Sequence, residues 1–228
     1  MGDFILNMII HKITNMKRTF TFLLSLLLTW FTVSAQQAEL HKTVAGRYKS
    51  LNSFSATVKL TRHNVALTND IVTKGQYYWK RPNSQSMVFA DTKEMLLAVG
   101  NSYTMVKGGK QRTIKAKGMG NNPFEILSDI YTHLQSADSN GSLTTQANVS
   151  VTKQGASYLL TVTPKTTDAK ARRRLMFTSL VITVDAKTGN MSRLLIHERG
   201  GNYSQYDFSG YALNANINSK MFTTQALK

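Results

Sequence analysis

The feature of this sequence that most restricts its fold is a long series of short, strand-like segments joined by tight turns. In residues 54–62 apolar and polar side chains alternate strictly, as in a strand with one buried face. Further strands are predicted near residues 70–81, 86–91, 94–99, 102–106, 111–114, 146–153, 156–164, 174–184, 191–199 and 202–211. Turns such as Gly100-Asn101 and Gly108-Gly109 join successive strands, which we therefore expect to be antiparallel neighbours.

Two helices interrupt the strands. Residues 37–51 have apolar side chains at every third or fourth position, which predicts a helix with one apolar stripe. A second helix is predicted to begin after Asn122, whose side chain can cap the first turn, and to end near residue 134. About ten antiparallel strands with two helices indicate a mainly β, α+β protein built as a curved sheet or open barrel, and they argue against a βαβ fold.

The first 35 residues have the pattern of a secretory signal peptide. A basic stretch precedes an uncharged, largely apolar run over residues 20–33, which ends in Val33-Ser34-Ala35. A membrane anchor is the alternative, but this run is shorter than the roughly 20 residues that span a bilayer. We expect export to the periplasm of a Gram-negative cell and a single mature domain over residues 36–228. Either Met1 or Met16 is a suitable start.

The composition excludes several classes of chemistry. The chain has no cysteine, so disulfides, thiolate metal sites and cysteine nucleophiles are excluded. Its histidines and carboxylates show no metal-ligand or acid–base pattern, and no serine-nucleophile motif is present. We therefore expect a protein that is not an enzyme and that needs no metal or cofactor.

The formal net charge of +16 favours an anionic partner. Nucleic acid is not expected, because no nucleic-acid-binding motif is present and export removes most such targets. Arg172, Arg173 and Arg174 form the densest basic run. They are either a solvated loop or a contact for an acidic partner or an anionic membrane.

Three successive predicted strands place apolar side chains on a common face. The set is Phe54, Ala56, Val58, Leu60, Tyr77, Trp79, Met87 and Phe89. Arg81 has the same parity as Tyr77 and Trp79, so it lies on this face at the end of its strand. It either reaches solvent past Pro82 or turns inward, where backbone carbonyls or a carboxylate must accept its hydrogen bonds. For the inward case we expect the acceptors in the second helix, over residues 121–134.

Several short motifs occur in the order found in one protein family. Residues 75–83 (GQYYWKRPN) resemble the G-x-x-x-x-K-R-P-N segment of the LolA-like family of periplasmic outer-membrane lipoprotein carriers. Residues 53–56 (SFSA) resemble its S-F-x-A strand, and residues 122–124 (NPF) resemble the start of its central helix. Residues 100–103 occupy the place of its D-G hairpin with Asp replaced, and Phe222 that of its closing segment. The resemblance extends over nearly all of the predicted domain.

This resemblance implies an unclosed antiparallel β-barrel of about 10–11 strands, with helices as a lid over a hydrophobic cavity. In the family the cavity shelters the acyl chains of lipoproteins that cross the periplasm. The eight apolar residues would then line the cavity, and Arg81 would be the switch that holds the lid.

The same resemblance implies the partners. They are acylated lipoproteins, an inner-membrane lipoprotein-releasing transporter and an outer-membrane acceptor, and we expect the chain to act as a monomer. Two alternatives share the fold: a regulatory domain that senses lipids or lipoproteins, and a carrier of another lipid.

The signal-peptide pattern gives a direct test. We expect cleavage after Ala35, so that the mature protein begins at Gln36, because the small-residue motif lies directly after the apolar run. Intact-mass measurement of the protein recovered from the periplasm checks the cleavage site. A chain that keeps its N-terminal segment and remains in the membrane fraction would contradict the carrier hypothesis.

Overall fold

The computed structural model describes the predicted domain in four continuous segments and two single residues. These are residues 35–115, 122–135, 143–165, 173, 175 and 177–227. The predicted signal segment up to residue 34 lies outside the described residues, and so do Arg172 and Arg174.

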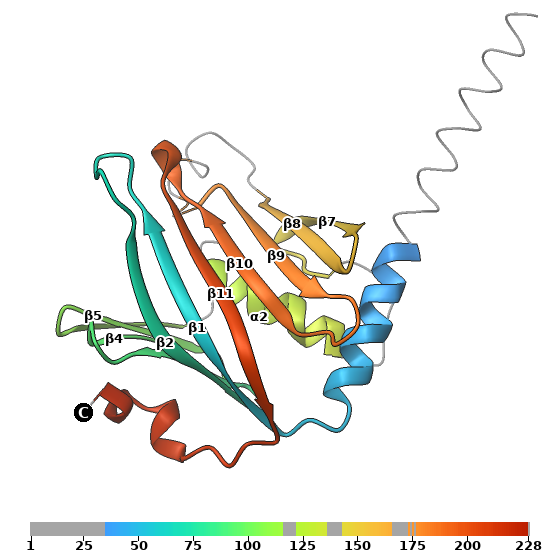
Figure 1. The fold of residues 1–228 in the computed structure, drawn as a ribbon, viewed down its shortest axis with the longest axis horizontal. Helices are drawn as coiled ribbons and strands as arrows, with labels where there is room; N and C mark the ends of the chain where they lie inside the picture. Colours follow the sequence, from blue (N-terminus) through green and yellow to red (C-terminus); the bar gives the residue numbers. More distant parts are fainter. Residues whose placement is uncertain are drawn as a thin grey trace, which may run out of the picture.

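The described residues form one antiparallel sheet of eleven strands (Figure 1). The strands are β1 (Ser53–His63), β2 (Ile71–Lys80), β3 (Ser84–Phe89), β4 (Glu94–Val99), β5 (Ser102–Lys107), β6 (Lys110–Lys115), β7 (Ala147–Gln154), β8 (Ser157–Pro164), β9 (Ser179–Asp185), β10 (Met191–His197) and β11 (Tyr203–Leu213). The predicted hairpin turns are confirmed: Gly100, Gly108 and Gly109 all have positive φ, as the favoured two-residue hairpin turns require. The predicted mainly β, antiparallel fold is therefore confirmed.

The first and last strands pair with each other in the middle of the sheet. The strand order is β6-β5-β4-β3-β2-β1-β11-β10-β9-β8-β7. The two edges are therefore β6 and β7, which follow one another in the chain and do not pair. The sheet curves without closing, so it has a concave inner face and a convex outer face (Figure 1).

The described residues contain two α-helices, besides the short 3-10 helices Arg199–Gly201, Ser219–Phe222 and Thr224–Leu227. Helix α2 (Pro123–Gln135) connects the two edge strands and lies across the inner face behind β10 and β11 (Figure 1). The Phe124 N–H donates to Asn122 Oδ1 at 3.0 Å, which confirms the predicted cap. The N-terminal helix, described over residues 35–48, packs against the turn between β9 and β10, where a Cβ on Gly189 would lie 3.1 Å from the Thr43 carbonyl oxygen.

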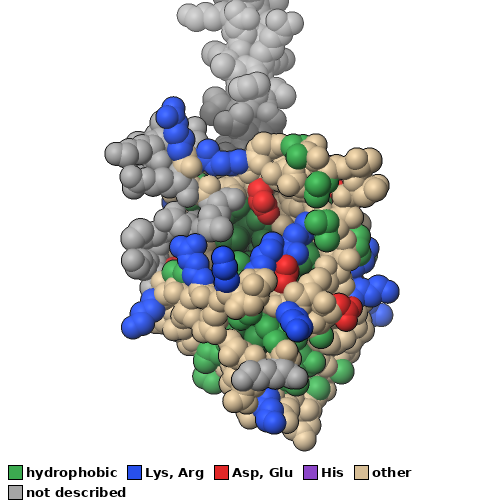
Figure 2. All heavy atoms as spheres, turned by 90° about the vertical axis from the view of Figure 1, so that its left-hand side faces the viewer, with side chains coloured by type: hydrophobic (Ala, Val, Ile, Leu, Met, Phe, Trp, Pro, Cys, Tyr) green, Lys and Arg blue, Asp and Glu red, His purple; other side chains and the backbone are tan. Residues whose placement is uncertain are grey.

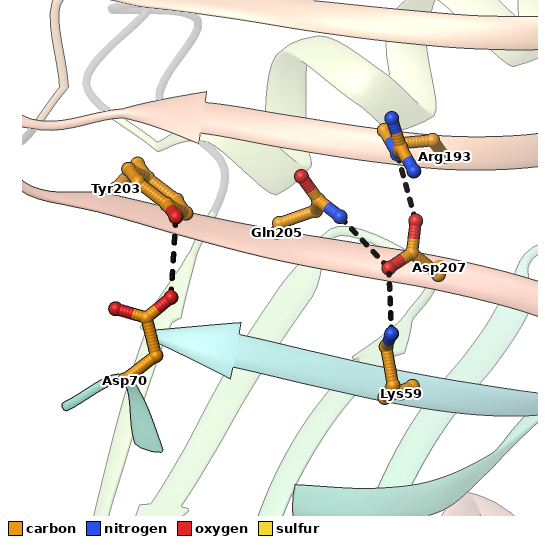
Figure 3. Close-up of polar contacts among 6 residues, drawn as sticks. All are labelled: Lys59, Asp70, Arg193, Tyr203, Gln205 and Asp207. Atoms are coloured by element: carbon orange, nitrogen blue, oxygen red, sulfur yellow. Dashed lines mark hydrogen bonds and ion pairs between the residues drawn. The ribbon is translucent and has the colours of Figure 1, made fainter. Parts of the chain in front are cut away.

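The outer face at the centre of the sheet is polar. Asp207 on β11 accepts hydrogen bonds from Arg193 at 2.7 Å and Gln205 at 2.8 Å, and Lys59 Nζ lies 3.6 Å away (Figure 3). Burial would raise the pKa of Asp207, but these hydrogen bonds and the two cations lower it below its usual value. Since β1, β10 and β11 direct these charged groups outward, their apolar side chains must face inward.

One strand is shorter than its sequence pattern predicts. The segment predicted as a strand over 174–184 becomes β9 only at Ser179. Leu175 and Phe177 are buried at odd positions, whereas the buried residues from Leu180 onward lie at even positions. A regular strand cannot change parity, so the chain must break its alternation between Phe177 and Leu180.

The approach of two strands explains a glycine in β2. A Cβ on Gly75 would lie 2.5 Å from the Val88 carbonyl oxygen and 2.6 Å from the Phe89 ring. We expect Gly75→Ala to lower the free energy of unfolding by about 1–3 kcal/mol, because backbone and ring must both shift. Gly46→Ala is the matched control: nothing lies within 4 Å of its Cβ, and alanine should leave stability unchanged or raise it by up to about 1 kcal/mol. Denaturant unfolding measures both, and equal stabilities would show that the sheet accommodates a methyl group at Gly75.

Candidate functional site

The eight apolar residues predicted to share a face do so. Each has at most 5% of its surface exposed, and β1 pairs with β2 in a register that places Phe54 beside Trp79 and Ala56 beside Tyr77. Met87 on β3 lies opposite Tyr77, which extends the same face across a third strand. All eight lie on the inner face, beneath the helices. Whether they contact a ligand remains a prediction.

Aromatic rings dominate one end of this face. The Phe54 ring stacks on that of Trp79 at 5.5 Å between centroids, and the edge of Tyr48 meets Trp79 at 5.3 Å. Tyr131 of α2 lies 6.3 Å from Tyr48, so rings from the sheet and from both helices meet here. We call this group the aromatic cluster; its members are Tyr48, Phe54, Tyr77, Trp79, Tyr131, Phe208 and Tyr211.

A bulge in β11 adds one member to the cluster. The register shifts between Ser55 and Thr57, where β11 has one residue more than β1, and Gly210 adopts φ +62°. The bulge turns Tyr211 inward, where its ring lies 5.3 Å from Phe54 and its hydroxyl donates to the Met191 carbonyl at 2.5 Å. Strict alternation missed Tyr211; the preceding glycine was its only sequence signal.

The aromatic cluster carries no charge. Burial raises the pKa of Tyr48, Tyr77, Tyr131 and Tyr211 above the usual value of a phenol. Their hydroxyls therefore stay protonated at any physiological pH. The Tyr77 hydroxyl bonds Gln85 Oε1 at 2.9 Å. This end of the inner face thus offers apolar surface with a few neutral polar groups.

The helices fill the concave side at the aromatic cluster. Leu40 and Val44 of the N-terminal helix and Ile126 and Ile130 of α2 are fully buried against the sheet. The hollow that remains inside the aromatic cluster has a volume of about 10 Å³, enough for roughly one water molecule. Its lining is Tyr48, Tyr77, Trp79, Gln85, Leu127, Tyr131, Gln135 and Met191. At the aromatic cluster the inner face is therefore closed.

Arg81 fastens the N-terminal helix to the end of β2. Its Nε donates to the Leu51 carbonyl at 2.6 Å, and its Nη2 donates to the carbonyls of Tyr48 and of Lys49, the latter at 3.4 Å. These carbonyls lie at the C-terminus of the helix, where a cation also interacts favourably with the helix dipole. Bonding to backbone carbonyls is thus observed, while the residue as a whole stays exposed. The expected acceptors in residues 121–134 were wrong, because the end of β2 lies beside the N-terminal helix rather than α2.

The far side of the inner face is less covered. Leu96 on β4 is half-buried, whereas Met105 on β5 and Ile114 on β6 are 42% and 37% exposed. Figure 2, seen from the side of β4 and β5, shows a hollow with hydrophobic side chains inside, and Lys, Arg and some Asp or Glu side chains around it. Among the described residues, the concave side is therefore packed at the aromatic cluster and less covered at β5 and β6.

Of the basic run at residues 172–174, the structure describes Arg173 alone. Arg173 is exposed. Within the described residues, no group of three or more His, Asp or Glu side chains is arranged to hold a metal ion. No helix in the described part of the chain is long and apolar enough to cross a membrane.

The chain is similar to known proteins in sequence and in structure. The sequence model of the family described as outer membrane lipoprotein carrier protein LolA matches residues 49–225. No curated protein sequence matches the chain.

Among solved structures, a DUF1329 family protein from Desulfovibrio piger is similar with a TM-score of 0.47 at 12% identity, covering 86% of this chain and 99% of that one. A putative outer membrane lipoprotein-sorting protein domain from Vibrio parahaemolyticus has a TM-score of 0.46 at 12% identity, with 85% and 99% covered. A LolA superfamily protein from Nitrosomonas europaea has a TM-score of 0.42 at 13% identity, with 82% and 96% covered.

The buried inner face can be tested at one position. Val58 is fully buried at the centre of this face, so Val58→Glu should lower the free energy of unfolding by about 3–5 kcal/mol and weaken binding of a fluorescent fatty acyl probe. Thr57→Glu, on the exposed outer face of the same strand, should change stability by no more than about 0.5 kcal/mol. Thermal unfolding and probe titration compare the two. Wild-type probe binding by Val58→Glu would contradict the assignment of this face.

Proposed function

The chain belongs to the LolA family of outer membrane lipoprotein carrier proteins, and from this premise we propose that it shelters the acyl chains of lipoproteins against the inner face of its sheet. The observation that carries the proposal is the apolar face built by β1, β2 and β3, which is covered by a helix fastened through Arg81. The structure then corresponds to the empty, closed carrier. Loading requires the helix cover to move.

The energetics of such an exchange are nearly balanced. An acyl chain gains about 0.8 kcal/mol for each methylene group that it buries. To enter, it must replace apolar side chains of the helices, such as Leu40 and Val44, which lose their own burial when they move. Because one apolar contact replaces another, cargo can be held without becoming impossible to release.

The hydrogen bonds of Arg81 add a contribution to the free energy that favours the closed state. Hydrogen bonds to a charged group contribute about 1.5–3 kcal/mol each, and those of Arg81 form only when the end of the N-terminal helix lies against β2. They stabilise the closed, empty protein and not the loaded one. In a carrier this contribution lowers the affinity for cargo and promotes release.

The proposed setting is the periplasm. The carrier would receive an acylated lipoprotein from an inner-membrane lipoprotein-releasing transporter and deliver it to the outer membrane, with or without an acceptor there. The chemistry is binding and release, for which no catalytic group or cofactor is required.

The role of Arg81 gives the test. Arg81→Leu keeps an apolar stem and removes every donor, so the closed state should lose stability relative to the loaded one. We expect about tenfold tighter binding of a fluorescent acyl probe. In a two-step assay with spheroplasts and outer membranes, the variant should accept lipoprotein yet deliver it poorly.

Lys80→Leu is the matched control, since Lys80 is the adjacent exposed cation and Arg81 alone of the two bonds the helix. It should load and deliver like the wild type. Fluorescence of Trp79, whose ring touches Tyr48 of the helix, reports movement of the cover. If Arg81→Leu folds normally and delivers cargo at the wild-type rate, the proposed switch does not exist.

A further inference from the structure

The inner face changes from apolar to cationic on going from β1 to β6. Strand pairing aligns its residues in rows that run across the strands. One row continues from Tyr77 through Met87, Leu96 and Met105 to Arg112. The adjacent row contains Phe89, Glu94, Lys107 and Lys110. Each row thus begins with buried apolar or aromatic groups and ends in exposed cations.

Contacts support the inward direction of Arg62 and Lys107, and strand pairing places Lys110 and Arg112 on the same face. Glu94, which is 9% exposed, accepts a hydrogen bond from Arg62, and its other carboxylate oxygen lies 3.9 Å from Lys107 Nζ. Lys110 and Arg112 are exposed and make no ion pair with the described residues. These residues form a group of four cations, Arg62, Lys107, Lys110 and Arg112, with one carboxylate, Glu94. The net charge of the group is +3. We call this group the cationic rim.

The cationic rim lies beside partly exposed apolar surface. Met105 pairs directly with Arg112, and Ile114 is the next inner residue on β6. Both are more than one third exposed. The carboxylates of α2 act nearer the other end of these strands, because Glu125 and Asp129 lie close to Tyr103, on the far side of Met105 from Lys107.

We infer that this end of the inner face binds the anionic headgroup of an amphiphile. Lys110 and Arg112, with Lys107, contact a phosphate or similar group, while Met105 and Leu96 contact the first part of its acyl chain. The inference rests on the proposed acyl-binding function and adds a charge requirement to it. A headgroup placed here remains in water at the open side of the sheet, and its chain points toward the aromatic cluster.

The experiment compares two probes with the same single acyl chain. The headgroup of lysophosphatidylglycerol has a net negative charge, whereas that of lysophosphatidylcholine is zwitterionic and has no net charge. Both are titrated as monomers against the mature protein by Trp79 fluorescence. We expect about fivefold tighter binding of the anionic probe at low ionic strength, with the preference declining as salt is added.

Matched variants locate the preference. Lys110→Gln with Arg112→Gln should abolish the preference, because the anionic probe loses more affinity than lysophosphatidylcholine, whose choline offsets the charge of its phosphate. The control is Lys74→Gln with Lys115→Gln, which removes the same charge from exposed positions on the outer face of β2 and β6. The control should keep the preference.

Each contrary result overturns the inference in a recognisable way. Equal affinity of the wild type for the two probes leaves acyl binding intact and removes the headgroup site. A preference that survives in the inner variant, or disappears equally in the control, shows that the cationic rim does not recognise the headgroup. Glycerol phosphate binding as tightly as the anionic probe would show that the site takes a free phosphate. If neither probe binds, the proposed acyl-binding function fails as well.

Discussion

The constraint on which this structure depends is that a curved, unclosed sheet must cover its concave face. Three strands alone direct Phe54, Val58, Trp79 and Phe89 to that side, and water contact with such a surface is unfavourable. Helix α2 covers part of the concave face, because it connects the two edge strands, β6 and β7. The N-terminal helix covers a further part. A carrier uses this requirement, since a cargo chain can take the place of a helix that covers the face.

The two faces divide the remaining tasks. On the outer face, Asp207 ties β1, β10 and β11 together through Lys59, Arg193 and Gln205, so the central pairing does not depend on the helices (Figure 3). On the inner face, Arg81 holds the end of the N-terminal helix to β2. Within the described residues, its hydrogen bonds are the only contacts between the two that involve a charged group. The sheet is therefore a stable frame, and the cover can be released by losing a few directional bonds.

The helices cover the inner face unevenly, so its two ends differ in exposure and charge. The aromatic cluster is dry and uncharged because both helices lie over it, and burial keeps its tyrosines protonated. At β5 and β6, Lys107, Lys110 and Arg112 are exposed and can remain hydrated on the inner face. An amphiphile fits such a surface in one direction, with its chain toward the cluster and its headgroup toward the rim.

Local sequence determined the strands, their turns, both helices and the set of eight inner residues, because alternation and glycine-containing turns depend on nearest neighbours. The same parity left two directions open for Arg81. Only the tertiary structure decided that it bonds backbone and which helix it fastens, that β1 pairs with β11, that a bulge at Gly210 turns Tyr211 inward, and that the helices fill the concave side at the aromatic cluster. These features join residues far apart in the chain, and a period-two pattern contains no information on which distant strand or helix will lie beside it.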